Sequence, residues 1–230
     1  MMSVLLWGGT GQAKVLRPIL AAQGYSVAAV YDRDASLASP FPDVPLLSPL
    51  SALDQWLGLN RAVRRFAVAV GGDKGADRLE IADLLIARGL APVTAIHQRA
   101  WVAESAHLGD GCQVMAMAAI SEEVRLGRQC IVNTSASVDH ECILDDGVHV
   151  MPGATLAGCV RVGRCATIGS NATVLPRLNI GAGAVIGAGA VVTRDVPSGA
   201  VMIGVPARPY APSATAQVVE LEAVPRKAMS

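Results

Sequence analysis

A six-residue repeat runs through this chain and limits the folds it can adopt. An aliphatic residue recurs at every sixth position without a break in register: Ile96, Val102, Leu108, Val114, Ile120, Leu126, Val132, Val138, Leu144, Val150, Leu156, Val162, Ile168, Val174, Ile180, Ile186 and Val192. Four residues after many of these comes a second, mostly small residue: Ala100, Ala106, Cys112, Ala118, Val124, Cys130, Ala136, Cys142, Val148 and Ala154. A helical period of 3.6 residues cannot stay in phase with a six-residue repeat. The repeat therefore predicts a hexapeptide β-helix.

Each hexapeptide reads as one short strand and a corner, with its aliphatic and small residues pointing inward. A single hexapeptide cannot bury that inner face, so successive coils must stack. Three hexapeptides would make a triangular coil of about 18 residues. The pattern resembles the left-handed β-helix of hexapeptide-repeat acyltransferases. The left hand is implied by that resemblance and not by the periodicity, because most crossover connections are right-handed.

The first 95 residues lack the repeat, and a chain of 230 residues can hold two domains. We expect one domain over residues 1–95, the β-helix over 96–210, and a disordered tail over 211–230, where no pattern is evident. Hydrophobic residues make up 52% of the chain but aromatic residues only 3%. A narrow prism filled by aliphatic side chains explains this combination, because its interior leaves little room for rings.

Charge and hydropathy argue against several partners. The formal net charge is zero and no basic run occurs, so nucleic acid and anionic membranes are not expected as partners. No apolar stretch reaches the roughly 18 residues of a membrane span, and the apolar start ends too early, at Gly8, for a signal peptide. We therefore expect a cytoplasmic protein.

Three of the cysteines occupy inward positions and are predicted to be reduced packing residues: Cys112, Cys130 and Cys142.

The N-terminal residues alternate between strand and helix patterns. Strands are predicted over 4–7, 27–30 and 66–70, helices over 13–22, 51–58 and 74–88, and a loop over 36–49. This alternation predicts a small parallel α/β sheet. Glycine-rich turns follow the first and third strands, at residues 8–12 and 71–73, and such turns suit a phosphate or ribose. A tight turn that binds nothing explains them equally well.

A dinucleotide cofactor fits the first turn poorly. Lys14 stands where the GxGxxG motif has its third glycine. Asp32, at the end of the second predicted strand, is placed to bind a ribose whichever ligand occupies the turn.

His140 is the histidine with the most chemistry around it. It follows the inward Val138 by two positions, near the middle of a predicted strand, and Asp139 and Glu141 flank it. A neighbouring carboxylate favours the protonated ring, which suits a general base. On these residues alone, a surface histidine among acids is the more common interpretation. Of the other histidines, His97 is predicted to be structural and His107 to be exposed to solvent.

From Val4 to Arg208 the chain resembles sugar acetyltransferases that join a small Rossmann-like domain to a left-handed β-helix. It is most similar to bacterial N-acetyltransferases of nucleotide-linked 4-amino-sugars, as in bacillosamine and perosamine pathways. The resemblance is carried by the glycine turn before Ala13-Lys14, Ile96-His97, Asn133-Thr134-Ser135, His140-Glu141-Cys142, His149-Val150, Pro152-Gly153-Ala154, Ala157-Gly158 and Gly204-Val205-Pro206-Ala207.

This resemblance implies a role for each candidate residue. His140 would be the catalytic base and Glu141 the residue that tunes it. Acetyl-CoA, the co-substrate, would bind at His149, Gly158, Ser170 and Ala188. The nucleotide-linked amino-sugar would bind at Thr10, Gly11, Gln12, Asp32, Arg33, Asp73 and Asn133. Many relatives have a histidine where this chain has Gln12, so the chain departs from them at that contact with the reacting sugar.

A homotrimer that needs no metal is also implied, with acetyl-CoA between subunits. The spacing of His140 and His149 also indicates a site between subunits. Nine residues are half of a coil, which predicts that His140 lies on one face and His149 near the opposite corner. At about 3.3 Å per residue, one chain could not bring both rings to one thioester, so we expect the active site to span two chains.

Three other functions remain open from the sequence. The same base could serve an O-acetyltransferase acting on a sialic acid or a similar sugar. A lyase resembling γ-type carbonic anhydrases would need three histidines on one zinc, but His97 and His107 lie coils away from His140. The last alternative is a non-catalytic module that binds a sugar nucleotide.

Overall fold

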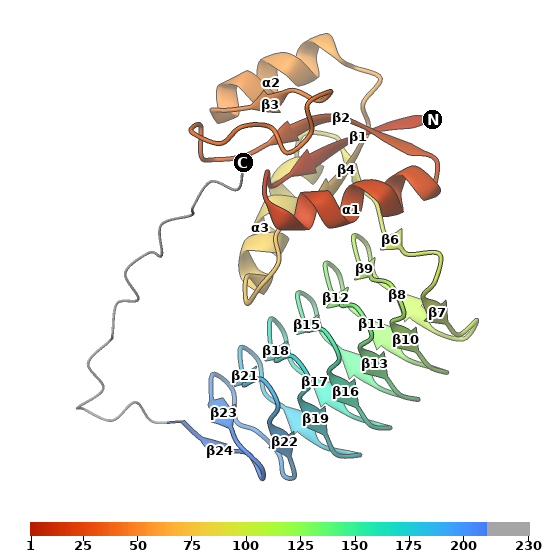
Figure 1. Cartoon of the computed structure of the whole chain (residues 1–230), viewed down its shortest axis with the longest axis vertical. Helices are drawn as coiled ribbons and strands as arrows, with labels where there is room; N and C mark the ends of the chain where they lie inside the picture. Colours follow the sequence, from red (N-terminus) through yellow and green to blue (C-terminus); the bar gives the residue numbers. More distant parts are fainter. Residues whose placement is uncertain (211–230) are drawn as a thin grey trace, which may run out of the picture.

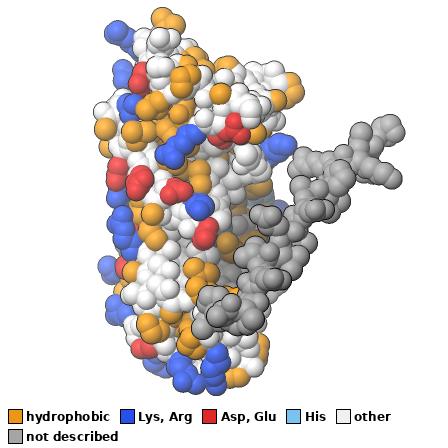
Figure 2. Space-filling model, turned by 90° about the vertical axis from the view of Figure 1, so that its left-hand side faces the viewer, with side chains coloured by type: hydrophobic (Ala, Val, Ile, Leu, Met, Phe, Trp, Pro, Cys, Tyr) orange, Lys and Arg blue, Asp and Glu red, His pale blue; other side chains and the backbone are white. Residues whose placement is uncertain are grey.

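The computed structural model describes residues 1–210 of the chain, so the tail over 211–230 and its predicted disorder lie outside the described residues. An α/β unit occupies one end of the molecule and a column of stacked β-coils the other (Figure 1). Figure 2 shows a face of the molecule on which acidic, basic and hydrophobic side chains are interspersed. In the described part of the chain, no helix has the length and apolar character needed to cross a membrane.

The α/β unit is built on a five-stranded parallel sheet with the order β3-β2-β1-β4-β5. Its elements are β1 (Met2–Trp7), α1 (Gly11–Ala22), β2 (Tyr25–Tyr31), β3 (Leu46–Leu47), α2 (Leu50–Leu59), β4 (Arg65–Val68), α3 (Gly75–Ile86) and β5 (Ala91–Pro92). The predicted strands and helices are confirmed with small shifts of their ends. The prediction of an unbroken loop over 36–49 is wrong at β3, because two residues are too few to show an alternating pattern.

The coils form a prism whose three sides are sheets of very short strands. The first side, here the β13 sheet, contains β7 (Trp101–Val102), β10 (Ala119–Ile120), β13 (Ser137–Val138), β16 (Thr155–Leu156), β19 (Thr173–Val174) and β22 (Val191–Val192). The second, the β14 sheet, contains β8 (His107–Leu108), β11 (Arg125–Leu126), β14 (Ile143–Leu144), β17 (Arg161–Val162) and β20 (Asn179–Ile180). The third, the β15 sheet, contains β6 (Ala95–Ile96), β9 (Gln113–Val114), β12 (Ile131–Val132), β15 (His149–Val150), β18 (Thr167–Ile168), β21 (Val185–Ile186), β23 (Val201–Ile203) and β24 (Arg208–Pro209).

Successive coils pair in parallel, as Ser137 does with Thr155 in the next coil, which confirms three hexapeptides per coil. Four-residue corners join the strands, and the third residue of a corner commonly has a positive φ, such as 59° at Glu141 and 62° at Cys159. This left-handed conformation is uncommon for residues other than glycine. Here it recurs because each corner must turn the chain sharply between two faces.

The predicted inward positions form the core of the prism. From Cys112 onward they are buried, and Ala136, Val138 and Cys142 have no exposed surface. The three inward cysteines are unpaired and buried, as predicted. Ile96, Val102 and the other inward residues of the first coil are only partly buried, because no earlier coil covers them.

The α/β unit packs directly on the β15 sheet. Met115 and Ile131, which face outward from the coils, belong to the same buried cluster as Leu16 of α1 and Val93. The two parts of the chain are therefore joined by a shared hydrophobic cluster, which is separate from the core inside the prism. Removal of residues 1–95 would expose this apolar face of the coils.

Arg78 of α3 is the largest fully buried side chain among the described residues. Its Nε donates to the carbonyl of Gln129 at 3.1 Å and its Nη2 to the carbonyl of Gly147 at 2.7 Å. Both carbonyls belong to the corner between the β14 and β15 sheets. A Cβ on Gly75, the first residue of α3, would lie 2.3 Å from the Gly147 oxygen. The N-terminal turn of α3 is thus in close contact with this corner.

We expect Arg78→Ala to lower the free energy of unfolding by about 2–4 kcal/mol, because it leaves a cavity and two unpaired carbonyls. Arg88→Ala is the matched control, since Arg88 pairs with Asp54 at the surface and such pairs contribute at most about 1 kcal/mol. Denaturant unfolding of both variants measures the difference. Equal losses would show that the buried arginine does not hold α3 on the coils.

Candidate active site

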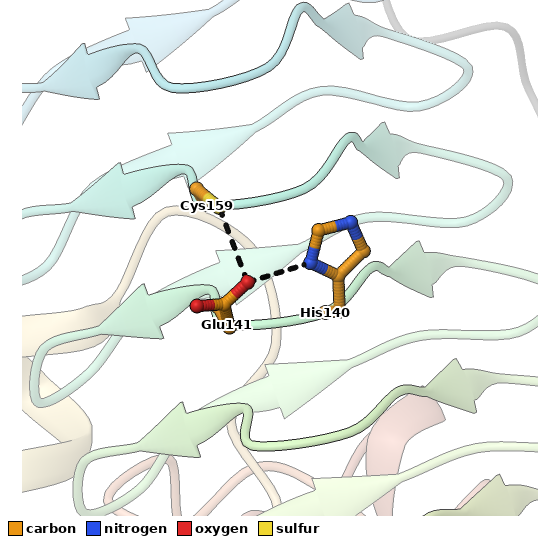
Figure 3. A group of neighbouring side chains, drawn as sticks. All are labelled: His140, Glu141 and Cys159. Carbon is orange, nitrogen blue, oxygen red and sulfur yellow. Dashed lines mark hydrogen bonds and ion pairs between the residues drawn. The ribbon is translucent and has the colours of Figure 1, made fainter.

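His140 and Glu141 lie together at the corner between the β13 and β14 sheets. Nδ1 of His140 is 3.0 Å from Oε2 of Glu141, and about half of each side chain is exposed (Figure 3). The predicted position of His140 within a strand is wrong. The strand ends at Val138, and His140 is the second residue of the four-residue turn that follows.

The contact with Glu141 determines which nitrogen of His140 is free. The hydrogen bond from His140 is the main reason that the pKa of Glu141 is lowered, with a second contribution from Cys159. An ionised carboxylate only accepts hydrogen bonds, so Nδ1 carries the proton and Nε2 keeps its lone pair. The pair therefore presents Nε2 as the basic atom.

Gly158 lies one coil above His140, offset by 18 residues, and faces the ring. A Cβ at this position would be 2.5 Å from Nε2 and 2.6 Å from Cε1 of His140. Only glycine leaves space for the ring in this orientation. The structure therefore places two of the predicted residues, His140 and Gly158, against each other.

We predict that Gly158→Ala lowers kcat by at least about tenfold, because the methyl group displaces Nε2 of His140. The melting temperature should change little, since the exposed ring can move away. Gly58→Ala is a control for an added methyl group, because no atom lies within 4 Å of a Cβ there and Gly58, in α2, has no positive φ. Unchanged kcat in the Gly158 variant would exclude this orientation of the ring in the active enzyme.

Cys159 is a neighbour of this pair that the sequence interpretation missed. Its thiol donates to Oε2 of Glu141 at 3.6 Å, from one coil above (Figure 3). The sequence could have revealed this contact, because Cys159 and Glu141 are 18 residues apart and residues at that offset stack in successive coils.

His149 lies on the β15 sheet, beneath the loop that joins β4 to α3. Its Nδ1 is 2.8 Å from the carbonyl of Gly72 and its Nε2 is 3.1 Å from Nδ2 of Asn133. Burial lowers the pKa of His149 to about 4, so the ring is neutral at neutral pH. Nδ1 therefore donates to Gly72, and Nε2 accepts from Asn133.

The predicted placement of the two histidines is thus reversed. His140 is at a corner, whereas His149 is on a face, because the strands are only two residues long and the corners four. In a triangular prism the corner between the β13 and β14 sheets is opposite the β15 sheet. The structure therefore brings His149 together with Asn133 but not with His140.

The predicted sugar-nucleotide residues of the α/β unit lie at the carboxyl edge of its sheet, whereas Asn133 lies on the coils after β12. Residues 10–12 begin α1 after β1, and Asp73 follows β4. Because β2 and β4 lie on opposite sides of β1, this edge is the topological switch point at which such sheets bind ligands. The loop with Asp73 is also the one held by His149.

Asp32 supports the first glycine turn. Its Oδ2 accepts a hydrogen bond from the backbone N–H of Gly9 at 2.6 Å. Asp32 and Arg33 also line a cavity of about 150 Å³ with Trp7 and Asp77. The side chain of Asp32 therefore shapes the turn and faces the edge where a ribose is expected.

Gln12 connects the glycine turn to the coils. Its Nε2 donates to Oε1 of Gln113 at 2.7 Å, and Nε2 of Gln113 donates to the carbonyl of Val68 at 2.6 Å. Gln113 is buried and was not among the predicted residues. Its outward position in a strand gave no functional signal, because the contact depends on how the α/β unit is seated.

Ser170 and Ala188, predicted to contact acetyl-CoA, lie at the corner between the β15 and β13 sheets. They are therefore at a different edge of the prism from Gly158. Depressions of about 510 and 450 Å³ lie along the β14 sheet, and none of the predicted site residues line them. One chain alone does not assemble the predicted cofactor residues.

The remaining histidines show no catalytic contacts in the described residues. Nδ1 of His97 accepts from the backbone N–H of Arg99 at 3.0 Å, which supports its predicted structural role, and His107 is exposed, as predicted. In residues 1–210 the one group of three potential metal ligands contains a single histidine. The three-histidine zinc site of the lyase alternative does not form among these described residues.

Comparison with known proteins gives close matches. No family model matches the chain. A perosamine N-acetyltransferase from Caulobacter crescentus, solved with CoA and GDP-perosamine, superimposes with a TM-score of 0.81 at 37% identity, covering 91% of this chain and 97% of that one. The acetyltransferase domain of PglB from Neisseria gonorrhoeae superimposes with a TM-score of 0.81 at 32% identity, over 91% of this chain and 100% of the domain.

A curated GDP-perosamine N-acetyltransferase from Escherichia coli O157:H7 is 36% identical over 139 residues. The match covers 60% of this chain and about half of that protein, 54% of its length. Sequence identity above 30% extends over nearly the full length of two solved structures and includes both the α/β unit and the coils. The chain therefore belongs to the family of bacterial sugar N-acetyltransferases that includes the perosamine and bacillosamine type.

Proposed function

We propose that this protein transfers the acetyl group of acetyl-CoA to the amine of a nucleotide-linked amino-sugar. The observation that carries the proposal is the exposed His140–Glu141 pair, whose hydrogen bond holds the proton on Nδ1 and leaves the lone pair of Nε2 free beside Gly158. The full-length similarity to N-acetyltransferases favours an amine over the hydroxyl acceptor of the O-acetyltransferase alternative. Because acetyl-CoA is made in the cytoplasm, we place the reaction there.

The residues of the corner account for the chemistry. The sugar amine attacks the thioester carbonyl, and Nε2 of His140 takes the proton that the amine must lose. Glu141 holds the proton on Nδ1 and stabilises the imidazolium that forms. We assign the backbone N–H of Gly158 as a donor to the tetrahedral oxyanion. CoA leaves as a thiolate, so this sequence of steps needs no metal.

We assign the sugar nucleotide to the carboxyl edge of the α/β sheet. Thr10 and Gly11 offer backbone N–H groups at the start of α1, where a phosphate is favoured. Asp32 and Arg33 are assigned to the nucleoside, and Asp73 to the loop over it. Gln12 and Asn133 face the sugar from opposite sides of the junction with the coils. A 4-amino-4,6-dideoxy sugar, as in GDP-perosamine, is the class that the relatives favour.

The geometry of one chain favours a site shared between two copies. The base is at the corner opposite the sheet that carries His149, Asn133 and the α/β unit. We propose a homotrimer of left-handed prisms, in which the His140 corner of one copy meets the β15 side of the next. Acetyl-CoA would lie between them, with Gly158 from one copy and His149, Ser170 and Ala188 from its neighbour. Residues 1–95 would bind the sugar nucleotide and residues 96–210 acetyl-CoA.

The proposal is tested with purified protein, acetyl-CoA and GDP-, UDP- or dTDP-linked 4-amino-sugars. Mass spectrometry should show one added acetyl group on at least one of them, with release of one thiol per acetyl group. The matching 4-hydroxy sugar nucleotides serve as controls for O-acetylation. Acetylation of only the hydroxyl compounds, or binding of sugar nucleotide without thiol release, would overturn the assignment.

A further inference from the structure

Cys159 gives the His140–Glu141 corner a third side chain that the acetyl-transfer steps do not use. Its Sγ, a ring nitrogen of His140 and a carboxylate oxygen of Glu141 all lie within 4.8 Å of one another. The three side chains converge from two successive coils, and Glu141 is linked to each of the other two by a hydrogen bond (Figure 3). In the part of the chain that the structure describes, this is the one place where such a group occurs.

Two of the distances between these atoms are on the scale of a zinc site. With the usual Zn–S, Zn–N and Zn–O bond lengths, the edges of a tetrahedral site are about 3.4–3.6 Å. Sγ of Cys159 is 3.6 Å from Oε2 of Glu141, and Nδ1 of His140 is 3.0 Å from the same oxygen. About half of the His140 and Glu141 side chains is exposed. A small rotation of either side chain therefore lengthens the distance between Nδ1 and Oε2.

The types of ligand select the metal. A thiolate, an imidazole and a carboxylate together suit Zn²⁺ and other late transition metals, whereas Mg²⁺ and Ca²⁺ prefer oxygen atoms alone. Three protein ligands leave the fourth tetrahedral position for water. We propose that His140, Glu141 and Cys159 bind Zn²⁺ and that the bound ion switches off the catalytic base. The inhibition rests on the proposed function, but the metal binding does not.

The switch acts through the tautomer of His140. In the free protein Nδ1 carries the proton and Nε2 the lone pair that accepts a proton from the substrate. A zinc ion on Nδ1 requires the lone pair of that atom, so the proton of the neutral ring moves to Nε2. The imidazole then has no free lone pair where the amine arrives. The total number of protons on the ring does not change.

Cys159 supplies the proton that zinc releases. In the free protein Cys159 is a thiol that donates to Oε2 of Glu141. Binding therefore forms a Zn–S bond, breaks the S–H bond and releases one proton to solvent. No oxidant or reductant takes part.

The site is tested first by Co²⁺ binding, which reports the thiolate ligand without any acetyl transfer. The full chain should show a thiolate-to-cobalt charge-transfer band that Cys159→Ser lacks. Cys165→Ser is the matched control, because Cys165 also has a positive φ, 56°, at a corner and is partly buried. It should keep the band. A band of equal intensity in the Cys159 variant would overturn the site.

The inhibition is tested by mass spectrometry of the acetylated sugar during a Zn²⁺ titration. Mutation of a residue that only hydrogen-bonds to a metal ligand already lowers the metal affinity by about 10–100-fold. Cys159→Ser should therefore need at least about tenfold more Zn²⁺ for half-inhibition, relative to its own zinc-free rate. A chelator should restore the wild-type rate, and Mg²⁺ should not inhibit. Equal sensitivity of both proteins would overturn the switch, and if no acceptor is acetylated the cobalt spectrum still decides whether the site exists.

Discussion

Replacement of His140 by alanine is expected to lower kcat by roughly 10²–10⁴-fold, the usual contribution of a general base. The reason is geometric, because Nε2 of His140 is the basic atom beside Gly158 and Glu141 already holds Nδ1. The KM values should change much less, since the ring accepts a proton during reaction. Initial rates at saturating acetyl-CoA and sugar nucleotide give the comparison.

His107→Ala is the control for loss of a histidine from the coils. His107 is exposed on the β14 sheet and makes no contact with the His140 corner, so its removal should leave kcat within about twofold. Unchanged circular dichroism would show that the His140 variant is folded. A loss of less than about fivefold on replacing His140 would rule it out as the base.

Mixed assemblies should regain activity that neither parent has. His140→Ala chains lack the base but keep the β15 side, whereas His149→Ala chains lack the buried ring under the Gly72 loop but keep the base. If each site uses the corner of one copy and the β15 side of the next, random mixing makes about one quarter of the sites complete. Separately tagged chains, unfolded and refolded together, should reach about that fraction of the wild-type rate.

The His149 variant needs a second test, because His149 is buried and its loss leaves the Gly72 carbonyl unpaired. Asn133→Ala provides it, since Asn133 is partly exposed beside His149 on the same sheet. Either variant should complement His140→Ala. The two tags show whether mixed assemblies have formed. If they have, and neither His149→Ala nor Asn133→Ala restores activity to His140→Ala, the whole site lies within one copy.

The repeat in the sequence determined the coils and much of the corner that holds His140. A strict six-residue spacing fixes which residues point inward and which residues stack 18 positions apart. That rule alone places Gly158 above His140 and Cys159 above Glu141. What the repeat did not reveal is how each hexapeptide divides between strand and corner, because an inward position looks the same in both. The reversed placement of His140 and His149 follows from this.

Only the tertiary structure decided the contacts between the α/β unit and the coils. His149 reaches Gly72 across 77 positions, and Gln12 reaches Gln113 across 101. Arg78 binds two corner carbonyls in the same way. None of these pairs has a fixed offset, because each depends on how one rigid body is seated on another. Periodicity describes packing within the coils, whereas this seating depends on the shapes and hydrogen-bonding groups of two surfaces at once.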